Sequence, residues 1–238
     1  MKKLMKCTDA SFGYDSKPVV EDLNFEIYEG DYLFIVGENG SGKSTLVKGI
    51  LSLLKPMKGK IEFENGLKRS DIGYFPQQTE IKNDFPASVK EIVLSGCISS
   101  SKGRFFYTKE DKTLAEDKMK LLDIYDINNK SFASLSGGQK QRVLLARALC
   151  AAKSMIILDE PASNLDPLVT AEFYSMIKKI NRETKVTVLM VSHDMRSILK
   201  YAKKILHLGE KDNFFGDVNQ YLSSDMGKKF MGGNRYYD

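Results

Sequence analysis

Cysteine is scarce in this sequence, and the few thiols are far apart. The 238 residues contain only three cysteines, Cys7, Cys97 and Cys150, and no two of them form a CxxC pair. An odd number of widely spaced thiols argues against a disulfide framework and against a zinc knuckle. Reduced thiols, as in cytosolic proteins, are the better interpretation.

Long hydrophobic runs are also missing. The longest, "YLFIV" and "VTVLMV", fall far short of the ~20 apolar residues that a membrane-spanning helix needs. The N-terminal stretch "MKKLMKCTDASFGYD" begins with basic residues but has no apolar segment after them, so a secretory signal peptide is not expected. We therefore expect a chain that does not cross a membrane by itself, although it can dock on a protein that does.

Charge of one sign is not concentrated anywhere in the chain. The 36 basic and 31 acidic residues give a net charge of +5, and no long basic block is present. Such a mild bias is typical of a solvated surface, so we expect no nucleic-acid partner. The hydrophobic content of 42% is enough for a packed core. The length suits one large domain or a core with a subdomain.

Short apolar runs predict buried strands at residues 32–36, 155–158 and 186–191. Helical periodicity follows the first two runs. Its apolar positions are Leu46, Val47, Ile50, Leu51 and Leu54 after the first run, and Phe173, Met176, Ile177 and Ile180 after the second. Alternating strands and helices predict an α/β fold with a mostly parallel sheet.

The remaining segments predict two additions to this core. The first thirty residues contain short antiparallel pieces, "DASFGYD" and "LNFEIY", and "GKIEFENG" resembles a further hairpin strand, so an N-terminal antiparallel β subdomain is expected. Between residues 88 and 135, "SVKEIVLSG" and "EDKTLAEDKMKLLDIYDI" have the pattern of helices, which predicts an inserted helical subdomain. We expect residues 1–238 to form a single domain that ends in a loose tail at 226–238.

A glycine-rich loop, "GENGSGKST", matches the pattern G-x-x-x-x-G-K-[ST] between a predicted strand and a predicted helix. Its glycines allow backbone N–H groups to surround phosphates. Lys43 is expected to reach the β- and γ-phosphates, and the Ser44 hydroxyl is expected to bind magnesium. A purely structural glycine turn is the alternative, which the strand and helix context disfavours. The predicted nucleotide-binding residues of this loop are Gly37, Glu38, Asn39, Gly40, Ser41, Gly42, Lys43, Ser44 and Thr45.

Two carboxylates follow the second buried run, in "SMIILDEPASNLD". A carboxylate at the end of a buried strand can hold hydrated magnesium, which is the role we expect for Asp159. Glu160 is placed to polarise an attacking water. Acidic residues in this position are often only helix starters, and Pro161 does indicate a turn. The pair becomes a strong prediction only together with the phosphate loop.

A second glycine-containing helix start, "LSGGQ" at residues 135–139, precedes an apolar helix pattern. The free N–H groups and the dipole at such a helix start favour an anion. One small chain thus has two predicted anion sites. With this segment in place, the sequence resembles the ATP-binding cassette (ABC) ATPase family over essentially its whole length, and that implies a P-loop NTPase core.

The resemblance assigns roles to further residues. "FGYD" carries Tyr14, similar to the aromatic residue that stacks on adenine, and "GYFPQQ" carries Gln77, similar to the glutamine that contacts magnesium and the attacking water. "SNLD" resembles the D-loop and places Asp166 at the nucleotide, and "VSHD" carries His193, similar to the switch histidine. The implied catalytic residues are Glu160, His193 and Gln77, the implied metal ligands are Ser44, Gln77 and Asp159, and the implied cofactors are ATP and Mg²⁺.

In this family two cassettes pair head to tail, and each ATP lies between the phosphate loop of one and the LSGGQ helix of the other. The resemblance therefore implies a homodimer formed on ATP binding, and it accounts for the second anion site. The residues expected to contact the partner's γ-phosphate are Ser136, Gly137, Gly138 and Gln139. Asn164 and Lys140 depart from the commoner alanine and glutamine of the family. Neither change removes a catalytic group, so an active enzyme is expected.

The sequence most resembles the zinc, manganese and iron importer branch, through "FPASVKEIVLSG", "RFFYTKEDK" and "NFFGDVNQYL". This implies a cytoplasmic subunit, peripheral on the inner face of the cell membrane, that energises import. Its partners would be integral membrane permease subunits and, indirectly, an extracytoplasmic solute-binding protein. The ion passes through the permease, so no zinc site is expected in this chain. Phe85 is expected to contact a permease helix in a groove of the helical subdomain, and a core position is the alternative for it.

Several alternatives stay open at this point. One is the ATPase of another small-solute transporter. Another is a soluble ABC ATPase acting in DNA repair or on ribosomes, although too few residues separate Gln77 from "LSGGQ" for the long coiled-coil arm of such proteins. A scaffold without turnover is disfavoured by the presence of both Glu160 and His193. An ordinary strand tyrosine is the alternative for Tyr14, and a structural histidine for His193. His207 matches no motif and is expected to be structural.

Overall fold

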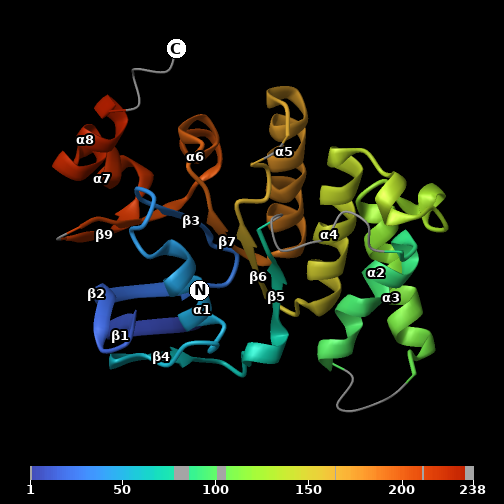
Figure 1. The fold of residues 1–238 in the computed structure, drawn as a ribbon, viewed down its shortest axis with the longest axis horizontal. Helices are drawn as coiled ribbons and strands as arrows, with labels where there is room; N and C mark the ends of the chain where they lie inside the picture. Colours follow the sequence, from blue (N-terminus) through green and yellow to red (C-terminus); the bar gives the residue numbers. More distant parts are fainter. Residues whose placement is uncertain (1, 78–85, 101–105, 164, 211, 234–238) are drawn as a thin grey trace. The chain divides into compact units, whose positions relative to one another are not determined.

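The structure is a computed structural model that describes residues 2–77, 86–100, 106–163, 165–210 and 212–233. The chain, coloured along its length in Figure 1, divides into two compact units. The first unit consists of Met1–Leu67 and Val188–Asp238, and the second of Lys68–Thr187. The second unit is thus one continuous stretch of chain inserted into the sequence of the first.

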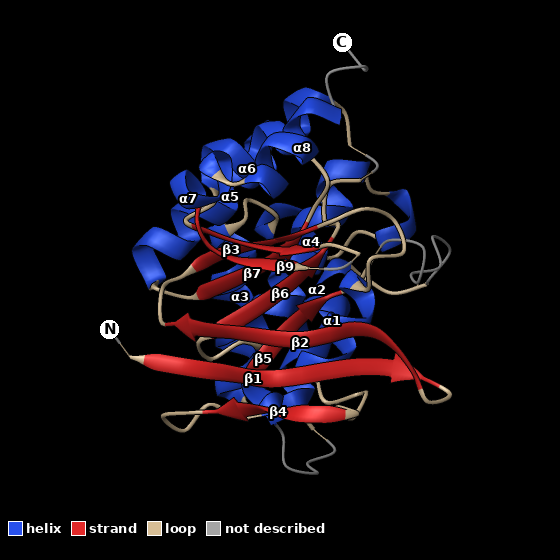
Figure 2. Ribbon diagram, turned by 90° about the vertical axis from the view of Figure 1, so that its left-hand side faces the viewer, coloured by secondary structure: helices blue, strands red, loops and turns tan. Residues whose placement is uncertain are grey.

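The first unit begins with a three-stranded antiparallel sheet in the order β2-β1-β4 (Figure 2). Its strands are β1 (Lys3–Tyr14), β2 (Lys17–Tyr28) and β4 (Lys58–Phe63). The predicted antiparallel sheet is confirmed, but the predicted short pieces are two strands of 12 residues each. The register shifts between Cys7 and Ala10, where Asp9 has a φ of 45°. This bulge interrupts the apolar alternation, so the pattern of a continuous strand looks fragmented.

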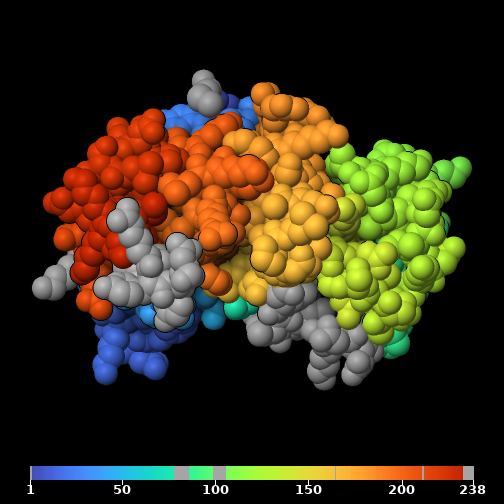
Figure 3. All heavy atoms as spheres, turned by 90° about the horizontal axis from the view of Figure 1, so that it is seen from above, coloured from blue at the N-terminus to red at the C-terminus, as the bar shows by residue number. Residues whose placement is uncertain are grey.

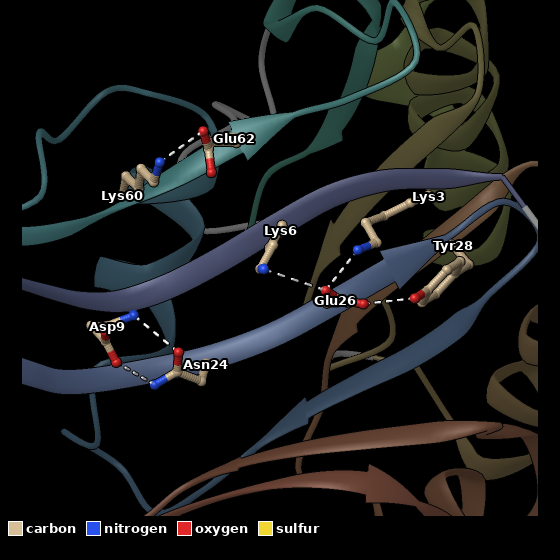
Figure 4. A network of polar contacts seen from close by, with 8 residues as sticks. All are labelled: Lys3, Lys6, Asp9, Asn24, Glu26, Tyr28, Lys60 and Glu62. Atoms are coloured by element: carbon tan, nitrogen blue, oxygen red, sulfur yellow. Dashed lines mark hydrogen bonds and ion pairs between the residues drawn. The ribbon is translucent and has the colours of Figure 1, made fainter.

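A network of polar side chains joins the strands of this sheet (Figure 4). Glu26 accepts hydrogen bonds from the Lys3 ammonium at 2.7 Å and from the Tyr28 hydroxyl at 2.6 Å. These bonds hold the pKa of the Glu26 carboxyl below its ordinary value. Because the groups are partly exposed, such pairs add little to stability. The sheet therefore depends on its buried apolar residues, among them Met5, Cys7, Leu23, Phe25 and Ile27.

Four further strands follow one another in the order β7-β3-β8-β9. They are β3 (Tyr32–Val36), β7 (Thr187–Val191), β8 (Lys204–Leu208) and β9 (Asn213–Asp217). β3 pairs in parallel with β7 and with β8, whereas β9 is antiparallel to β8. All five residues of β3 are buried, as its continuous apolar run predicts. The helices described in this unit are α1 (Lys43–Ile50), α6 (Met195–Tyr201), α7 (Val218–Ser223) and α8 (Asp225–Gly233).

The chain end differs from the predicted loose tail at 226–238. Residues up to Gly233 form α8, and residues 234–238 lie outside the described part of the chain. The Phe230 and His207 rings pack edge to face with centroids 4.7 Å apart, and a Cβ on Gly227 would lie 2.0 Å from the Tyr221 carbonyl oxygen. For residues 226–233 the prediction was wrong, because it relied on the glycines of "FMGGNRYYD" and overlooked Phe230, whose ring packs against His207 of β8.

His207 is structural, as the sequence predicts. Its ring is buried, and its Nδ1 lies 2.7 Å from the Tyr221 hydroxyl oxygen. Burial, with a smaller contribution from the charge of Lys43, lowers the pKa of His207 to about 4. The imidazole is therefore neutral at pH 7 and belongs to the core.

The second unit combines a parallel strand pair with helices. β5 (Ile72–Phe75) pairs with β6 (Met155–Asp159), and Phe75 lies opposite Leu158. The helices described in this unit are α2 (Val89–Ser95), α3 (Lys109–Leu121), α4 (Gly137–Ala151) and α5 (Pro167–Thr184). Single 3-10 turns lie at Arg69–Asp71, Gly96–Ser100, Tyr125–Ile127 and Phe132–Ser134. The yellow-green face in the space-filling view belongs to α3 and the chain that follows it (Figure 3).

Close backbone contacts join α4 to the rest of the second unit. A Cβ on Gly73 of β5 would lie 2.0 Å from the Ala148 carbonyl oxygen, and one on Gly96 would lie 2.1 Å from that of Arg147. Because of this packing, the compact unit extends well beyond the predicted helical subdomain of residues 88–135. The described residues of 88–135 form helices and 3-10 turns, apart from an isolated bridge between Ser88 and Ser131.

Three buried strands were predicted, and all three are found as β3, β6 and β7. Helix α1 follows β3 and helix α5 follows β6, as the periodicity predicts. Over the residues that the structure describes, no helix combines the length and the apolar character that a membrane span requires.

Candidate functional site

The predicted phosphate loop connects β3 to α1 in the first unit. Three of its glycines have left-handed backbone angles, with φ of 147° at Gly37, 85° at Gly40 and 93° at Gly42. A Cβ on Gly42 would lie 2.1 Å from Cγ2 of Val20, and one on Gly37 would lie 2.5 Å from the Leu208 carbonyl oxygen. Both conformation and packing therefore demand glycine at these two positions.

Lys43 begins α1 and folds back on the loop. Its Nζ donates to the carbonyl oxygens of Gly37 at 2.9 Å and Glu38 at 2.8 Å, and the residue is only 8% exposed. Gly42 is the N-cap of α1 and, having no side chain, does not cap the first N–H groups of the helix. The loop thus combines a buried positive charge with a helix N-terminus, an arrangement that favours phosphate.

The hydroxyl of Ser41 indicates that this loop fits a ligand. Its oxygen is buried and has no hydrogen-bond partner among the described residues. It lies 2.6 Å from the place that a Cβ on Gly37 would occupy. Buried hydroxyl groups almost always have a partner, and a phosphate oxygen can accept this one. The remaining loop residues Glu38, Asn39, Gly40 and Ser44 are exposed, whereas Thr45 is buried.

Tyr14, the predicted adenine contact, ends β1 and is 46% exposed. The Lys48 ammonium of α1 lies 5.8 Å from the centre of its ring and 3.4 Å from its hydroxyl oxygen. An exposed ring beside the phosphate loop's own helix suits stacking on a flat base. The adenine contact itself stays a prediction.

His193 and the phosphate loop leave the same edge of the sheet. β3 and β7 are parallel neighbours, and the Ser192 amide donates to the Ile35 carbonyl oxygen at 3.3 Å. Gly37 follows β3 directly, and His193 follows β7. In open α/β sheets, ligands bind beyond the carboxyl ends of such strands. His193 is exposed there, where a histidine can contact a bound phosphate.

Gln77 and Glu160 meet in the second unit. The Gln77 amide nitrogen Nε2 donates to Glu160 Oε2 at 3.2 Å. This contact follows from the parallel pairing of β5 and β6, because both residues lie just beyond the ends of adjacent strands. Asp159, the last residue of β6, is buried, and its Oδ2 accepts from the Tyr74 hydroxyl at 3.5 Å. Two adjacent strand ends thus gather three of the predicted catalytic and metal-binding side chains.

The backbone at Glu160 is strained, with a φ of 47°. A residue other than glycine pays roughly 1–2 kcal/mol for this left-handed conformation. Such strain persists only where the surrounding structure imposes it, and it is common at functional sites. The turn that begins at Glu160 therefore supports a functional carboxylate over a simple helix starter.

The LSGGQ segment begins α4 through a capping box. Ser136 Oγ accepts from the Gln139 amide at 3.3 Å, and the Ser136 amide donates to Gln139 Oε1 at 3.1 Å. Ser136 and Gly137 are exposed, and Gly138 is half-buried. The start of α4 is therefore accessible to an anion, and Gln139 also has a structural role that was not predicted.

Asp166 is the N-cap of α5. Its Oδ1 accepts from the amides of Leu168 at 3.1 Å and Val169 at 3.0 Å. Aspartate before Pro167 is a common way to begin a helix, so this role was readable from the sequence. Its predicted contact with the nucleotide stays a prediction. Phe85 and Asn164 lie outside the described residues.

Two supporting residues were missed by the sequence reasoning. Tyr74 reaches Asp159 from the neighbouring strand, and no sequence signal marks it apart from its position in β5. Asp194 caps α6 behind His193, and its carboxylate accepts from the Arg196 amide at 3.0 Å and from the Ser197 hydroxyl at 2.6 Å. An aspartate just before a helix is an ordinary N-cap signal and could have identified it.

Comparison with known proteins decides the family. The family model described as "ABC transporter" matches residues 20–163. The chain belongs to the ABC transporter family. The zinc uptake system ATP-binding protein ZurA of Listeria monocytogenes is 34% identical over 229 residues, which is 93% of this chain and 88% of that protein.

Solved ABC cassettes share the fold. A transporter described as being of the metal-chelate type, in an inward-facing conformation, has a TM-score of 0.86 at 30% identity and covers 97% of this chain and 90% of its own. The dimeric cassette MJ0796 bound to ADP and Pi has a TM-score of 0.73 at 27% identity, over 89% of this chain and 98% of its own. The α/β ABC ATPase fold is therefore confirmed.

Membership in the ABC family also confirms the enzyme class. The chain is an ATPase that binds ATP. The predicted resemblance to the metal-ion importer branch is confirmed by the zinc uptake relative and by the metal-chelate type structure. The family's names for these segments are used from here on: Walker A loop for the glycine loop, Walker B segment for β6 with Glu160, and signature for LSGGQ; the role of each residue in them stays a prediction.

Proposed function

We propose that this ABC cassette is the ATP-hydrolysing subunit of a divalent metal-ion importer, with zinc or manganese as cargo. The observation that carries hydrolysis is the contact of Gln77 with Glu160 on a strained turn, 3.2 Å between amide nitrogen and carboxylate oxygen. The cargo is supported by the zinc uptake relative and by the metal-chelate type structure. Import is energised through a separate membrane permease.

In this proposal the Walker A loop binds the phosphates of ATP. Lys43 moves its charge from two carbonyl oxygens of the loop to the β- and γ-phosphates, and Ser41 gains a phosphate partner for its hydroxyl. Tyr14 stacks on adenine. Lysine and backbone N–H groups together neutralise a polyphosphate, which has little covalent chemistry for the protein to perform.

Hydrolysis depends on three side chains. Glu160 accepts a hydrogen bond from the attacking water and polarises it, Gln77 orients that water beside Glu160, and His193 holds the γ-phosphate. The donor set of Ser44, Gln77 and Asp159 is all oxygen, as Mg²⁺ prefers. When bound, Mg²⁺ neutralises the charge that develops on the transferred phosphoryl group.

In this proposal two cassettes together bind each ATP. The exposed N-terminus of α4, with Ser136, Gly137, Gly138 and Gln139, contacts the γ-phosphate held by a second copy. The related MJ0796 cassette with ADP and Pi is dimeric, which supports the assembly. ATP then joins the two copies, and its hydrolysis releases them.

The cassette acts at the inner face of the cell membrane in this proposal, because it needs a permease to move an ion. A solute-binding protein outside the membrane delivers the cargo to that permease. Both partners are inferred from the import role of the relatives. The cargo itself does not contact the cassette.

Glu160→Gln tests the hydrolysis. Removing the carboxylate should lower phosphate release by at least about 100-fold while ATP binding persists, so an ATP-bound dimer should accumulate in gel filtration. Glu62→Gln, on the exposed surface of β4, is the matched control and should behave like the wild type. Normal turnover by the Glu160 variant would contradict the role of this residue.

Uptake of isotopic zinc and manganese tests the cargo. Proteoliposomes that contain the cassette and its permease should accumulate the ion only with ATP, and those with the Glu160 variant should not. Transport of a non-metal solute would favour another importer branch. Co-purification with ribosomes or DNA in place of membranes would favour the soluble ABC ATPase instead.

A further inference from the structure

Gln141 carries a fully buried amide for which the described part of the chain supplies no hydrogen-bond partner. It lies in α4, two residues beyond the LSGGQ signature, and is 0% exposed. Neither its Nε2 nor its Oε1 has a partner among the described residues. A primary amide carries two donors and an acceptor, and burying them unpaired costs stability. The surroundings of Gln141 should therefore explain why the chain keeps an amide there.

The first turn of α4 packs against the chain that follows β6. Gln141 lies four residues after Gly137 and three after Gly138, so the three share a face of the helix. A Cβ on Gly137 would lie 3.4 Å from Leu165 Cδ2, and one on Gly138 would lie 3.0 Å from Val169 Cγ1. The chain that follows β6 thus covers this face one turn before Gln141.

The same face meets β5 two turns after Gln141. A Cβ on Gly73 would lie 2.0 Å from the carbonyl oxygen of Ala148, which is seven residues further along α4. Seven helical residues span ~10 Å, and three strand residues span the same length. The step along α4 from Ala148 back to Gln141 therefore corresponds to the step along β5 from Gly73 to the end of that strand. There β6 also ends, because Phe75 pairs with Leu158.

Along the direction of β5 and β6, Gln141 therefore lies at the same position as the turn that carries Glu160. This turn spans residues 160–163, and two long hydrogen bonds hold the backbone there. The Ser163 amide donates to the Glu160 carbonyl oxygen at 3.3 Å, and the Leu165 amide donates to that of Ala162 at 3.2 Å. Each carbonyl oxygen can accept a second hydrogen bond. The turn therefore offers backbone acceptors to a neighbouring amide.

We propose that Gln141 is a positioning residue that hydrogen-bonds the backbone of the turn at residues 160–163 in the ATP-closed state and so fixes the Glu160 carboxylate for hydrolysis. This inference rests on the proposed ATP-driven closure. In the open state the amide is unpaired and destabilising, and in the closed state it is paired. The chain thereby gives up stability in the open state and gains an ordered catalytic turn in the closed one.

The proposal requires opposite effects on stability and on turnover. Gln141→Met removes the amide with little change in side-chain length. The nucleotide-free variant should unfold about 3 °C higher than the wild type, because an unpaired polar group is lost. Its kcat should fall about tenfold, equal to about 1.4 kcal/mol of barrier, while the Kd for ATP stays unchanged. A residue with a purely structural role in the open state would lower the unfolding temperature instead.

Leu145→Met is the matched control. Leu145 is fully buried one turn further along the same face of α4, and the exchange conserves volume. It should leave kcat within twofold of the wild type. Equal losses of kcat in both methionine variants would indicate general repacking and overturn the proposal.

Gln141→Glu adds a readout that packing alone would not produce. Burial raises the pKa of a carboxyl group, so a neutral carboxyl that can donate and accept like the amide prevails at low pH. The kcat of this variant, divided by that of the wild type, should therefore rise several-fold between pH 8 and pH 6. A ratio that does not change with pH would contradict the hydrogen-bonding role.

The outcomes separate this inference from the proposed function. A wild-type chain that releases no phosphate would overturn the ATPase mechanism, and the turnover part of the inference with it. An active wild type with a normal kcat in Gln141→Met would overturn the inference alone. A lower unfolding temperature in that variant would overturn it too, because the amide would then already have a partner in the open state.

Discussion

Two helices of this cassette begin beside glycines, and they begin in different ways. Helix α1 follows Gly42, which has a φ of 93° and a neighbour, Val20, that leaves no room for a side chain. Helix α4 follows Ser136, which has an ordinary extended backbone and closes a capping box with Gln139. The first start is held by glycine geometry, and the second by side chains that satisfy its own N–H groups.

In the proposed ATP-bound dimer, this difference corresponds to two separate steps at which the helix starts bind phosphate. The Walker A loop keeps a buried lysine in place and a Ser41 hydroxyl with no hydrogen-bond partner among the described residues, which suits the proposed binding of ATP by a single chain. The signature start is exposed and capped by its own residues. It can remain stable without a ligand until a second cassette presents one. The two starts should therefore respond differently to mutation.

Lys43→Ala should produce the largest effect, and it acts on the Walker A side alone. Losing the buried cation should lower turnover by at least about 100-fold and weaken ATP binding, because the polyphosphate loses its main positive partner. Binding of a fluorescent ATP analogue and phosphate release measure the two effects. Lys55→Ala, an exposed lysine in the same unit, is the control. Unchanged affinity in Lys43→Ala would place the nucleotide elsewhere.

Gly42→Ala and Gly137→Ala should differ in stability. The first introduces a left-handed alanine that collides with Val20 at 2.1 Å, so it should cost about 2–4 kcal/mol in the free energy of unfolding. The second places alanine in a helical conformation, 3.4 Å from Leu165, and should be neutral or stabilise by about 0.5 kcal/mol. Urea unfolding of both variants measures this. Equal losses would mean that the two helix starts do not differ as described.

Gln139→Ala should have the smallest effect. It opens half of the capping box of α4 and should cost about 0.5–1 kcal/mol. Gln139→Glu keeps an acceptor for the Ser136 amide and should cost nothing. Hydrogen exchange of the first turn of α4 reports the difference. If both variants exchange like the wild type, the capping box does not stabilise the signature start.

Sequence patterns predicted the local structure of this candidate site well where backbone chemistry demands particular residues. The Walker A glycines are required by their φ values, and β3 and β6 are continuous apolar runs because parallel strands are buried on both faces. Glu160 was predicted from its place at a strand end. The family resemblance singled out Gln77, but its contact with Glu160, 83 positions away in the sequence, follows from strand pairing that neither the resemblance nor residue patterns predicted.

Sequence patterns failed to predict local structure and burial where tertiary packing determines them. The bulge at Asp9 concealed the true length of β1 and β2, and Phe230 orders a segment whose glycines suggest a loose end. Gln141 was missed because a polar residue in an amphipathic helix normally faces water. Only its complete burial in the structure distinguishes it.

The most direct test of two shared sites mixes two inactive chains. Ser136→Arg fills the signature position but leaves the Walker A loop intact, and Lys43→Ala does the reverse. Paired, they place both lesions in one composite site and leave the other site complete. Gel filtration with ATP should show dimer in the mixture and only monomer for either variant alone. If the mixture also remains monomeric, the two helix starts do not share a nucleotide, and the account of a dimer joined by ATP is contradicted.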